Sequence, residues 1–498
     1  MNHAAPPRVA PEDRVPVAQK LGYGLGSFQD MWGHWLYPGM AYQVFNIYLG
    51  VSPALIARAL FLNRIFDAVS DPFFGWASDN TRTRFGRRRP FILAGSILAG
   101  LALPMLFFVR PGWSEMQYFW FMLGSSAVFI PLMSCFYMPY QSLGAELTPD
   151  YHERTSVFSF RYAIQKIPEV AMMFAAQFTT MAVWVGATNA DVLGRVTRLF
   201  TSASSWKAAV HEKPDILLGA QVYFAILGAG MILAGIGVFA LVRERYYGKL
   251  AKKQEKVSIT ETLYRALSCR PFRRQLLMVL AFQMGTSMVG TLGYYDTVYY
   301  VCRGDVALGA SWNFGMGLSS LALGLLGIPA FGFIARRSGK ILAMISVLAT
   351  AIVIYVGTWW FYDPDFPALQ LLASGFIAFI NGGFNTLEGS IGADVMDYDE
   401  LQSGKRREGA FSACKSWIMK LGMALGTLAS GEILQRTGFD ARLGPAQTPH
   451  ALFMIRLLLA VVPIAGLVLA LLAVSGLSLT EDRMREIRRE LETRRGTV

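Results

Sequence analysis

Charged residues are scarce in this chain. Only 16% of its 498 residues are Asp, Glu, Lys or Arg, whereas 53% are hydrophobic. Soluble domains carry about 25% charged residues, so much of this protein's surface must face something other than water. Aromatic residues make up 13% of the chain and there are 48 glycines, a mixture common in membrane-spanning helices and their interfaces. The composition therefore predicts a membrane protein.

Cysteine is also rare. Its four residues, at positions 135, 269, 302 and 414, lie far apart and show neither a pairing pattern nor metal-ligand spacing. We expect no cofactor and no metal other than a coupling ion. A cleavable signal peptide is not apparent, because residues 1–19 are polar and rich in proline and predict a short disordered tail. Targeting would then depend on the first hydrophobic segment.

The net charge of +12 raises the question of nucleic-acid binding, which requires a basic face on a soluble fold. The basic residues of this chain lie between apolar runs instead, so we expect no nucleic-acid partner. The expected partners are the lipid bilayer and a small-molecule solute, and we expect the protein to function as a monomer.

A helix needs about 20 mostly apolar residues to span a membrane, and by this measure the sequence predicts twelve spans. The expected fold class is therefore an all-α membrane protein. The first and fifth spans are the least regular, because polar residues interrupt both. The predicted spans are residues 21–49, 54–78, 90–109, 117–143, 156–185, 218–242, 273–302, 309–335, 340–361, 367–392, 409–435 and 451–476.

Lys and Arg gather in alternate loops, which indicates the orientation of the chain. The loops after spans 2, 6, 8 and 10 and the end of the chain are basic, whereas the loops between them hold few basic residues. We therefore expect both termini to be cytoplasmic. The predicted parts are a disordered cytoplasmic tail (1–19), a six-helix bundle (20–242), a cytoplasmic linker (243–272), a second six-helix bundle (273–476) and a cytoplasmic tail (477–498).

A weak internal repeat supports two related halves. Span 2 is followed by "DPFFGWASDNTRTRFGRR" and span 8 by "GIPAFGFIARRSGK", each with a proline three residues before a glycine and then a basic turn. Span 8 is the second span of its half, as span 2 is of the first. Two six-helix bundles around a central cavity are the architecture of a secondary transporter of the rocker type.

Span 2 carries an unusual set of ionisable residues, Arg64, Asp67 and Asp71. The two aspartates are four residues apart and therefore share a helix face, with Arg64 one turn before Asp67. Two carboxylates this close require a nearby cation, and ionisable residues at membrane depth usually mark a pathway for ions or substrate. We expect a site for a hard monovalent cation, with Ser70 adding a hydroxyl. The alternative is a buried Arg64–Asp67 ion pair that only fixes helix packing.

Other spans carry polar candidates for binding the solute. Spans 1 and 7 occupy matching positions in the two halves, and each is aromatic and glycine-rich with one central acid, a composition that suits a polyhydroxylated ligand. His34 lies among aromatic residues and is more typical of a packed or interfacial residue. Lys420, in the middle of span 11, is expected to be a counter-charge to Asp67 and Asp71, against the alternative that it reaches an interface. The candidates in spans 1, 7 and 10 are Asp30, Tyr295, Asp296, Asn385 and Glu388.

Three longer motifs resemble one family. "RIFDAVSDPFFGWASDNTRTRFGRRRPFIL", "YMPYQSLGAEL" with "ERTSVFSFR", and "GADVMDYDELQSGKRREGAFSACKSWIMKLGMALG" are similar to those of the glycoside–pentoside–hexuronide:cation symporters. These proteins are the melibiose-transporter branch of the major facilitator superfamily. The likeness runs from about residue 20 to residue 475, and it implies the major facilitator fold.

The resemblance implies roles for the matched residues. Asp67 and Asp71 match the pair that binds the coupling Na⁺, Li⁺ or H⁺, Arg64 matches an arginine beside that pair, and Lys420 matches the lysine that approaches it. Asp30 lies within one position of an acid that holds sugar hydroxyls.

Other matches concern the solute. Arg161 matches an arginine at the inner side of the cavity. Where the melibiose branch has a sugar-binding Asp this chain has Tyr137, and where that branch has a Trp four residues later this chain has Gln141. These departures count against a galactoside and leave the cation site intact.

Two inner loops combine acids and arginines. "DNTRTRFGRRR" and "DYDELQSGKRREG" predict a cytoplasmic gate closed by ion pairs, with Arg87, Arg88 and Asp397 as its candidates. The alternative for the arginines is simple anchoring of the topology. The long outer loop 186–217 contains the amphipathic stretch "VLGRVTRLF", which predicts a helix lying on the membrane or over the cavity.

The sequence therefore predicts a symporter in the cell membrane, the inner membrane if the source is bacterial, that moves a sugar or glycoside with Na⁺ or H⁺ by alternating access. A symporter of an amphipathic lipid such as a lysolipid is the nearer alternative. An intramembrane prenyltransferase is the remote one, since Asp67, Asp71 and Asp79 resemble its Asp-rich Mg²⁺ motifs. Twelve spans, a central linker and Lys420 argue against an enzyme.

Overall fold

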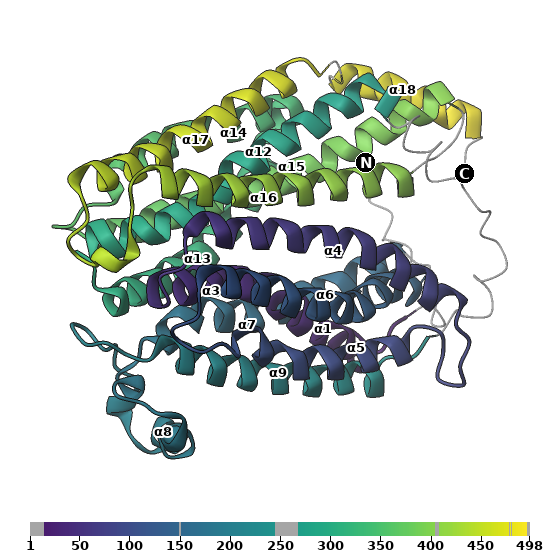
Figure 1. The fold of residues 1–498 in the computed structure, drawn as a ribbon. Coiled ribbons are helices and arrows are strands. Elements are labelled where there is room, and N and C mark those ends of the chain that lie inside the picture. The colour runs from purple at the N-terminus through teal and green to yellow at the C-terminus, as the bar shows by residue number, and fades with distance from the viewer. Residues whose placement is uncertain are drawn as a thin grey trace. The chain divides into compact units, whose positions relative to one another are not determined.

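The computed structural model describes residues 14–148, 151–244, 267–403, 408–477, 479 and 481–495. Among these residues the ordered structure is helical, apart from isolated bridges in loops (Figure 1). The expected all-α fold is thus confirmed for the described part of the chain. The chain divides into two compact units, residues 1–255 and 256–498, called here the N-terminal and C-terminal halves. Most of the predicted linker 243–272 lies outside the described residues.

The N-terminal half is built mainly from long helices joined by short connections. Its principal contacts pair α4 with α6, α5 with both α6 and α9, and α1 with α7. Its elements are α1 (Val17–Leu25), α2 (Ser27–Met31), the π-helix η1 (Trp32–Leu36), α3 (Tyr37–Ala41), the π-helix η2 (Tyr42–Tyr48), α4 (Pro53–Asn80), α5 (Arg89–Ala102), η3 (Leu103–Phe107), α6 (Glu115–Glu146), α7 (Tyr151–Thr179), η4 (Ala182–Trp184), η5 (Asn189–Asp191), α8 (Val192–Thr201), η6 (Ala203–Trp206) and α9 (Ile216–Leu241).

The first predicted span is helical but not uniform. It passes from α-helical to π-helical geometry twice between Val17 and Tyr48, and such π turns are frequent at functional sites. Polar side chains fasten it to its neighbours: the Gln29 Nε2 donates to the carbonyl of Met231 on α9 at 2.5 Å, and the Trp32 Nε1 donates to the carbonyl of Pro168 on α7 at 2.9 Å. The irregular stretch is therefore held by α7 and α9.

Helices α5 and α9 approach each other through glycine. A Cβ placed on Gly100 would lie 2.6 Å from the carbonyl oxygen of Gly228, and one placed on Gly228 would lie 2.3 Å from that of Gly100. Backbones can come this close in a membrane bundle only where small residues meet. A side chain at either position would force the two helices apart.

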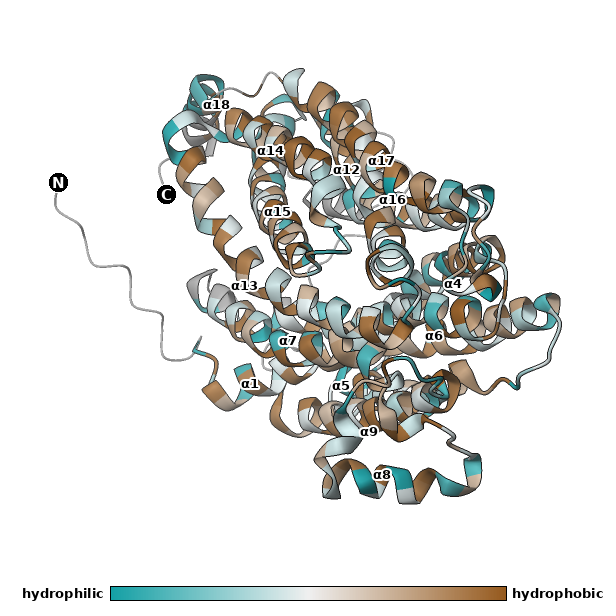
Figure 2. Ribbon diagram, turned by 90° about the vertical axis from the view of Figure 1, so that its left-hand side faces the viewer, coloured by the Kyte–Doolittle hydropathy of each residue, from teal (hydrophilic) through white to brown (hydrophobic). Residues whose placement is uncertain are grey.

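The amphipathic stretch of the outer loop forms α8. Figure 1 shows α8 nearly end-on where α9 is seen lengthwise, and Figure 2 shows the reverse, so α8 runs across the direction of α9. Leu193 and Phe200 of α8 are 81% and 84% exposed, whereas the Arg195 guanidinium donates to the carbonyls of Val183, Val185 and Gly186. An interfacial helix has this orientation and exposes apolar residues in this way.

The C-terminal half has long helices of the same kind. Its principal contacts pair α13 with α15, α12 with α16 and α17, and α14 with α15 and α17. Its elements are α12 (Arg270–Tyr295), the π-helix η7 (Asp296–Val301), α13 (Val306–Ser338), α14 (Lys340–Phe361), α15 (Leu369–Ser403), α16 (Glu408–Arg436), η8 (Ala441–Leu443), α17 (Pro449–Ser475) and α18 (Glu481–Arg495).

The repeat in the sequence has a structural counterpart. α4 and α13 each contain the proline of the motif, Pro72 and Pro329 respectively. After each helix the chain turns at a glycine of positive φ, Gly86 at 104° and Gly339 at 82°, where other residues would be strained. The next helices, α5 and α14, then begin at Arg89 and Lys340.

Seven helices among the described residues are long and apolar enough to cross a membrane. They cover Arg89–Phe107, Glu115–Gly144, Ile216–Leu241, Arg270–Val301, Val306–Ser338, Lys340–Phe361 and Pro449–Ser475. The other five predicted spans coincide with α1–η2, α4, α7, α15 and α16. Each of these five spans contains ionisable residues, which lower its mean hydropathy, so twelve crossings remain a prediction.

Candidate functional site

A first polar group lies on α4 and its neighbour α6. The Arg64 Nη1 lies 3.2 Å from the Asp67 Oδ2, and Asp67 is only 3% exposed. The Ser134 hydroxyl of α6 donates to the Asp71 Oδ1 at 2.8 Å and lies 2.7 Å from the Ser70 Oγ. The two aspartates thus have different neighbours, and Ser134 is a member of the group that the sequence did not single out.

The oxygen atoms of this group match a hard cation in kind. Carboxylate and hydroxyl oxygens are the ligands that hard cations prefer, and the group supplies both from Asp67, Asp71, Ser70 and Ser134. The Ser70 hydroxyl also donates to the carbonyl of Phe66 at 2.8 Å, which orients its lone pairs. No group of three or more His, Cys, Asp or Glu with metal-binding geometry occurs among the described residues.

A second polar group joins α2, α6 and α7. The Arg161 Nη2 lies 2.7 Å from the Asp30 Oδ2, and its Nη1 donates to the Gln141 Oε1 at 3.3 Å. Arg161 is buried, and its guanidinium lies 5.3 Å from the centre of the Tyr140 ring. The structure therefore brings together Asp30, Gln141 and Arg161, three of the predicted solute residues. Asp30 is held in place by an arginine on another helix.

His34 lies between the two groups. Its Nδ1 is 3.5 Å from the Asp30 Oδ1, and the Asp67 carboxylate and the Arg64 guanidinium are close enough to act on its ring electrostatically. The His34 ring packs edge-on against Tyr137 of α6, with 4.6 Å between ring centres. His34 is packed, as the sequence suggested, but it also connects the acids of α2 and α4, which the sequence did not reveal.

The C-terminal half holds a separate buried ion pair. The Glu388 carboxylate of α15 accepts from the Lys415 Nζ of α16 at 3.0 Å and from the Gln275 Nε2 of α12 at 2.8 Å. Asn385, one turn earlier on α15, is exposed. Lys420 also lies on α16 and is partly buried.

The predicted residues of span 7 lie elsewhere in that half. Tyr295 is fully buried and stacks on Tyr299, and buried Asp296 lies within electrostatic range of Arg456 of α17. Gln275, which bonds Glu388, precedes Asp296 by 21 residues on one continuous helical run, a separation of about 30 Å at 1.5 Å per residue. Tyr295 and Asp296 therefore do not form one group with Glu388.

Arg87 and Arg88 converge on an acid of their own half. Both guanidinium groups pair with the Glu146 Oε1 at the end of α6, that of Arg88 at 2.8 Å. Burial raises the pKa of the Glu146 carboxyl above its ordinary value, although Arg88 and Arg87 act in the opposite direction. The pairing fastens the start of α5 to the end of α6. Asp397 lies on α15 of the C-terminal half and is partly buried.

A further carboxylate supports the same turn. Glu244 accepts from the backbone N–H groups of Arg87, Arg88 and Arg89 at 3.0, 2.8 and 3.1 Å, which are free donors at the start of α5. A Cβ on Gly86 would lie 2.5 Å from the Glu244 Oε1. Glycine at this position therefore permits both the turn and the approach of the carboxylate.

The double variant Arg87→Gln/Arg88→Gln is expected to slow transport and lower thermal stability while leaving solute affinity nearly unchanged. It leaves the half-buried Glu146 carboxylate without its cations, a loss on the order of 3 kcal/mol for buried pairs. Transport rates in vesicles and thermal unfolding in detergent measure the two effects. Arg82→Gln/Arg84→Gln is the matched control, because both residues are exposed in the same loop. A normal transport rate in the correctly inserted double variant contradicts a gating role.

Comparison with known proteins places these features in context. A family model described as "MFS/sugar transport protein" matches residues 27–481. An uncharacterized symporter of Synechocystis is 25% identical, with 97% of this chain and 98% of the relative covered. The putative glycoside/cation symporter YagG of Escherichia coli is 24% identical over 96% and 95%, and the sodium-dependent lysophosphatidylcholine symporter 1 of Gallus gallus is 23% identical over 98% and 91%.

Solved structures share the fold at low sequence identity. A bacterial homologue of the human lysosomal transporter Spinster, in an inward-facing and unoccupied conformation, superposes with a TM-score of 0.64 at 15% identity, covering 95% of this chain and 97% of that one. At this identity the likeness concerns the fold alone.

Proposed function

The chain belongs to the MFS/sugar transport protein family, and from this premise we propose that it carries a sugar or glycoside-like solute together with Na⁺ or H⁺ by alternating access. Proteins of this family are membrane transporters and not enzymes, which removes the prenyltransferase alternative. The expected resemblance to the glycoside–pentoside–hexuronide:cation symporters is confirmed. The proposed location is the cell membrane.

One observation carries the proposal: the N-terminal half contains a series of neighbouring charged and polar side chains that are buried or partly buried. It runs from Asp71 and Ser134 through Arg64, Asp67 and His34 to Asp30 and Arg161. Burying so many charges in a membrane protein is costly, and such residues usually serve an ion or substrate pathway. The carboxylates of α4 are the proposed site of the coupling cation, and the Asp30–Arg161–Gln141 group with Tyr137 contributes to the proposed solute site.

Asp30 is bound to Arg161 and leaves little negative charge free for hydroxyl groups. A solute that binds here meets the guanidinium and the amide of Gln141 as hydrogen-bond donors and the ring of Tyr137 as an apolar wall. Glycosides and sugar acids both offer the oxygen atoms that such donors need. In the C-terminal half, Asn385 and Glu388 remain proposed solute contacts, and Tyr295 and Asp296 remain proposals for a position nearer the other end of that half.

A ligand screen tests the proposal. Purified protein is heated with a panel of glycosides and sugar acids, with and without Na⁺ and at two pH values, and the rise in Tm is measured. Binding of a solute to the folded state raises the protein's Tm by mass action. A solute that raises Tm to an extent that depends on Na⁺ or on pH therefore supports cation-coupled transport. Uptake of that solute in vesicles must then follow the cation gradient. The proposal is contradicted if no sugar of the panel raises Tm and if uptake of the panel's sugars into vesicles depends on neither the Na⁺ nor the H⁺ gradient.

A lysolipid is the second candidate solute, because a relative of similar coverage is named as a lysophosphatidylcholine symporter. The same screen includes lysophosphatidylcholine below its micellar concentration. Stabilisation by the lysolipid and not by any sugar assigns the transporter to lipid instead.

Lys420 provides a test of coupling. If Lys420 is the counter-charge of the proposed cation site, Lys420→Ala is expected to reduce cation-dependent uptake and leave folding intact. Lys420→Arg is not expected to restore it, because a planar guanidinium replaces a compact ammonium poorly. Arg436→Ala is the control on the same helix, because Arg436 is exposed in the last turn of α16. Wild-type cation dependence in Lys420→Ala vesicles makes Lys420 a packing or interfacial residue.

A further inference from the structure

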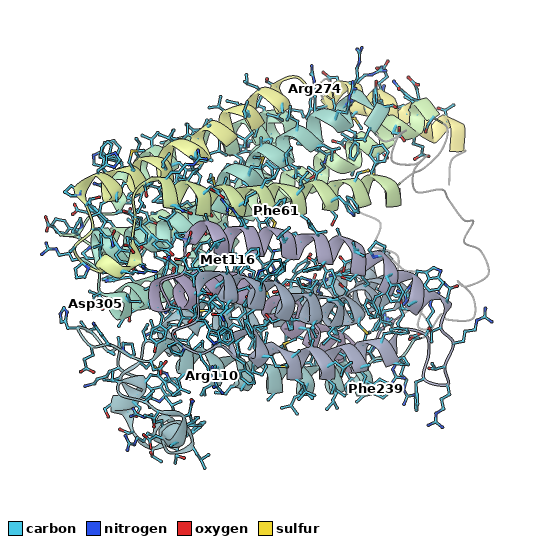
Figure 3. All side chains as sticks on the ribbon, in the orientation of Figure 1. Phe61, Arg110, Met116, Phe239, Arg274 and Asp305 are labelled. Carbon is cyan, nitrogen blue, oxygen red and sulfur yellow. The ribbon has the colours of Figure 1, made fainter. Side chains whose placement is uncertain are left out.

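The C-terminal half has a groove where α12 begins and α17 ends. The groove has a volume of about 460 Å³ and is lined by Arg270, Pro271, Arg273, Arg274, Leu277 and Gly476. α12 and α17 are packed along each other, so the walls of the groove are two well-supported helices. Figure 3 places Arg274 at the margin of the C-terminal bundle.

Three positive charges surround this groove. Arg270, Arg273 and Arg274 are all exposed, and within the part of the chain that the structure describes no carboxylate pairs with their guanidinium groups. Other basic residues of this half are neutralised: Lys340 pairs with Asp394 at 2.6 Å and Arg485 with Glu481 at 2.5 Å. The groove is therefore a local concentration of unneutralised positive charge and favours an anion.

Gly476 determines where one of these charges lies. A Cβ on Gly476 would lie 2.1 Å from the Arg274 Nη1, so the guanidinium rests directly against the backbone that follows α17. The carbonyl end of a helix carries partial negative charge and attracts a cation. Arg274 is thus held across the groove between α12 and α17.

Exposed apolar side chains lie one helical turn from the groove's polar end on both helices. Leu277, one turn further along α12, is 51% exposed, and Leu472 near the end of α17 is 65% exposed. Both helices are long and apolar enough to cross a membrane. Leu277 lies one turn further into α12 than Arg273 and Arg274, and Leu472 lies one turn before Gly476 on α17. A ligand that fills the groove thus meets positive charge at one end and apolar surface at the other.

We propose that this groove binds the headgroup of an anionic phospholipid, with the phosphate at Arg273 and Arg274 and an acyl chain along Leu277 and Leu472. Basic pockets beside membrane helices recognise acidic headgroups in this way, and arginine binds phosphate oxygens through paired N–H groups. The binding needs neither the solute nor the coupling ion.

Native mass spectrometry of the detergent-purified protein tests the proposal by lipid titration. Phosphatidylglycerol, phosphatidylcholine and inorganic phosphate are compared. We expect phosphatidylglycerol to bind more tightly than phosphatidylcholine, and Arg273→Gln/Arg274→Gln to weaken it by roughly 25-fold, or about fivefold for each arginine near a membrane surface. Arg336→Gln/Arg337→Gln, which removes two exposed arginines from the end of α13, is expected to leave the affinity at the wild-type level.

A second variant separates binding from folding. Gly476→Ala keeps every charge, and φ is −89° at this position, so alanine is tolerated by the backbone while its Cβ displaces the Arg274 guanidinium. We expect weaker phosphatidylglycerol binding at unchanged Tm. Equal affinity for phosphatidylcholine, or wild-type affinity in both groove variants, overturns the proposal and leaves the arginines as topology anchors. If inorganic phosphate displaces phosphatidylglycerol and binds with the same affinity as that lipid, the proposal is overturned and the groove is a site for a free anion.

Discussion

Asp67→Asn and Asp71→Asn are each expected to abolish accumulation of the solute against its gradient. The amide keeps the size of the side chain but removes the negative charge that a cation requires. Asp67→Asn removes the ion pair with Arg64. Asp71→Asn keeps an amide oxygen that can still accept from the Ser134 hydroxyl, which lies 2.8 Å from the Asp71 Oδ1, so this variant loses the charge alone. At least one variant is expected to retain downhill exchange of the solute, because the Asp30–Arg161 pair is intact in both.

Uptake in membrane vesicles, with and without a cation gradient, measures this effect. Asn63→Ala is the matched control: Asn63 lies one turn before Asp67 on α4, is buried, and donates to Ser126 at 2.8 Å. This control loses a buried hydrogen bond but no charge, so it is expected to keep concentrative uptake. Accumulation at the wild-type level in both aspartate variants contradicts the proposed cation site.

Arg161→Gln is expected to eliminate solute binding and to destabilise the protein. It removes the partner of Asp30 at 2.7 Å, and breaking a buried ion pair typically costs about 3–5 kcal/mol. Arg161→Lys is expected to recover part of the stability but little binding, because lysine lacks the fork that reaches both Asp30 and Gln141. Thermal unfolding and ligand-induced shifts in Tm measure the two effects separately.

The double variant Asp30→Asn/Arg161→Gln distinguishes a binding role from a structural one. It removes both charges together, so no unpaired charge stays buried and stability is expected to return. If the pair contributes to the solute site, transport is still lost. Recovery of both stability and transport would show that the pair only supports the packing of α2 against α7.

The sequence predicted the helices well because their apolar runs are long and their basic turns recur. Glycine at positions 86 and 339 and proline at 72 and 329 indicated equivalent turns in the two halves, and the structure has them. The irregular helix geometry of the first span could not be predicted from the sequence. Its π-helical turns depend on contacts with α7 and α9, such as the hydrogen bond from Gln29 to Met231, which hydrophobic periodicity does not encode.

The candidate site was predicted in part, and the gaps have a common cause. Helical spacing indicated that Arg64 and Asp67 share a face, and they form an ion pair. Ser134 and Glu146 were missed because they belong to a different helix from the residues they bond, and a polar residue on a neighbouring helix carries no sequence signal of its partner. Glu244 was missed for the same reason, since it bonds backbone groups of α5 from more than 150 residues away.

His34 lies 3.5 Å from the Asp30 carboxylate of α2, and its ring also interacts electrostatically with Asp67 of α4. With the proposed solute group around Asp30 on different helices from the proposed cation group on α4, residues such as Tyr137 and Gln141 can be exchanged while the proposed cation ligands on α4 are unaltered. Such a transporter can change its solute specificity without a change in the residues proposed to couple transport to the cation gradient. Directed evolution toward other solutes is therefore best confined to α2, α6 and α7, with position 34 kept fixed.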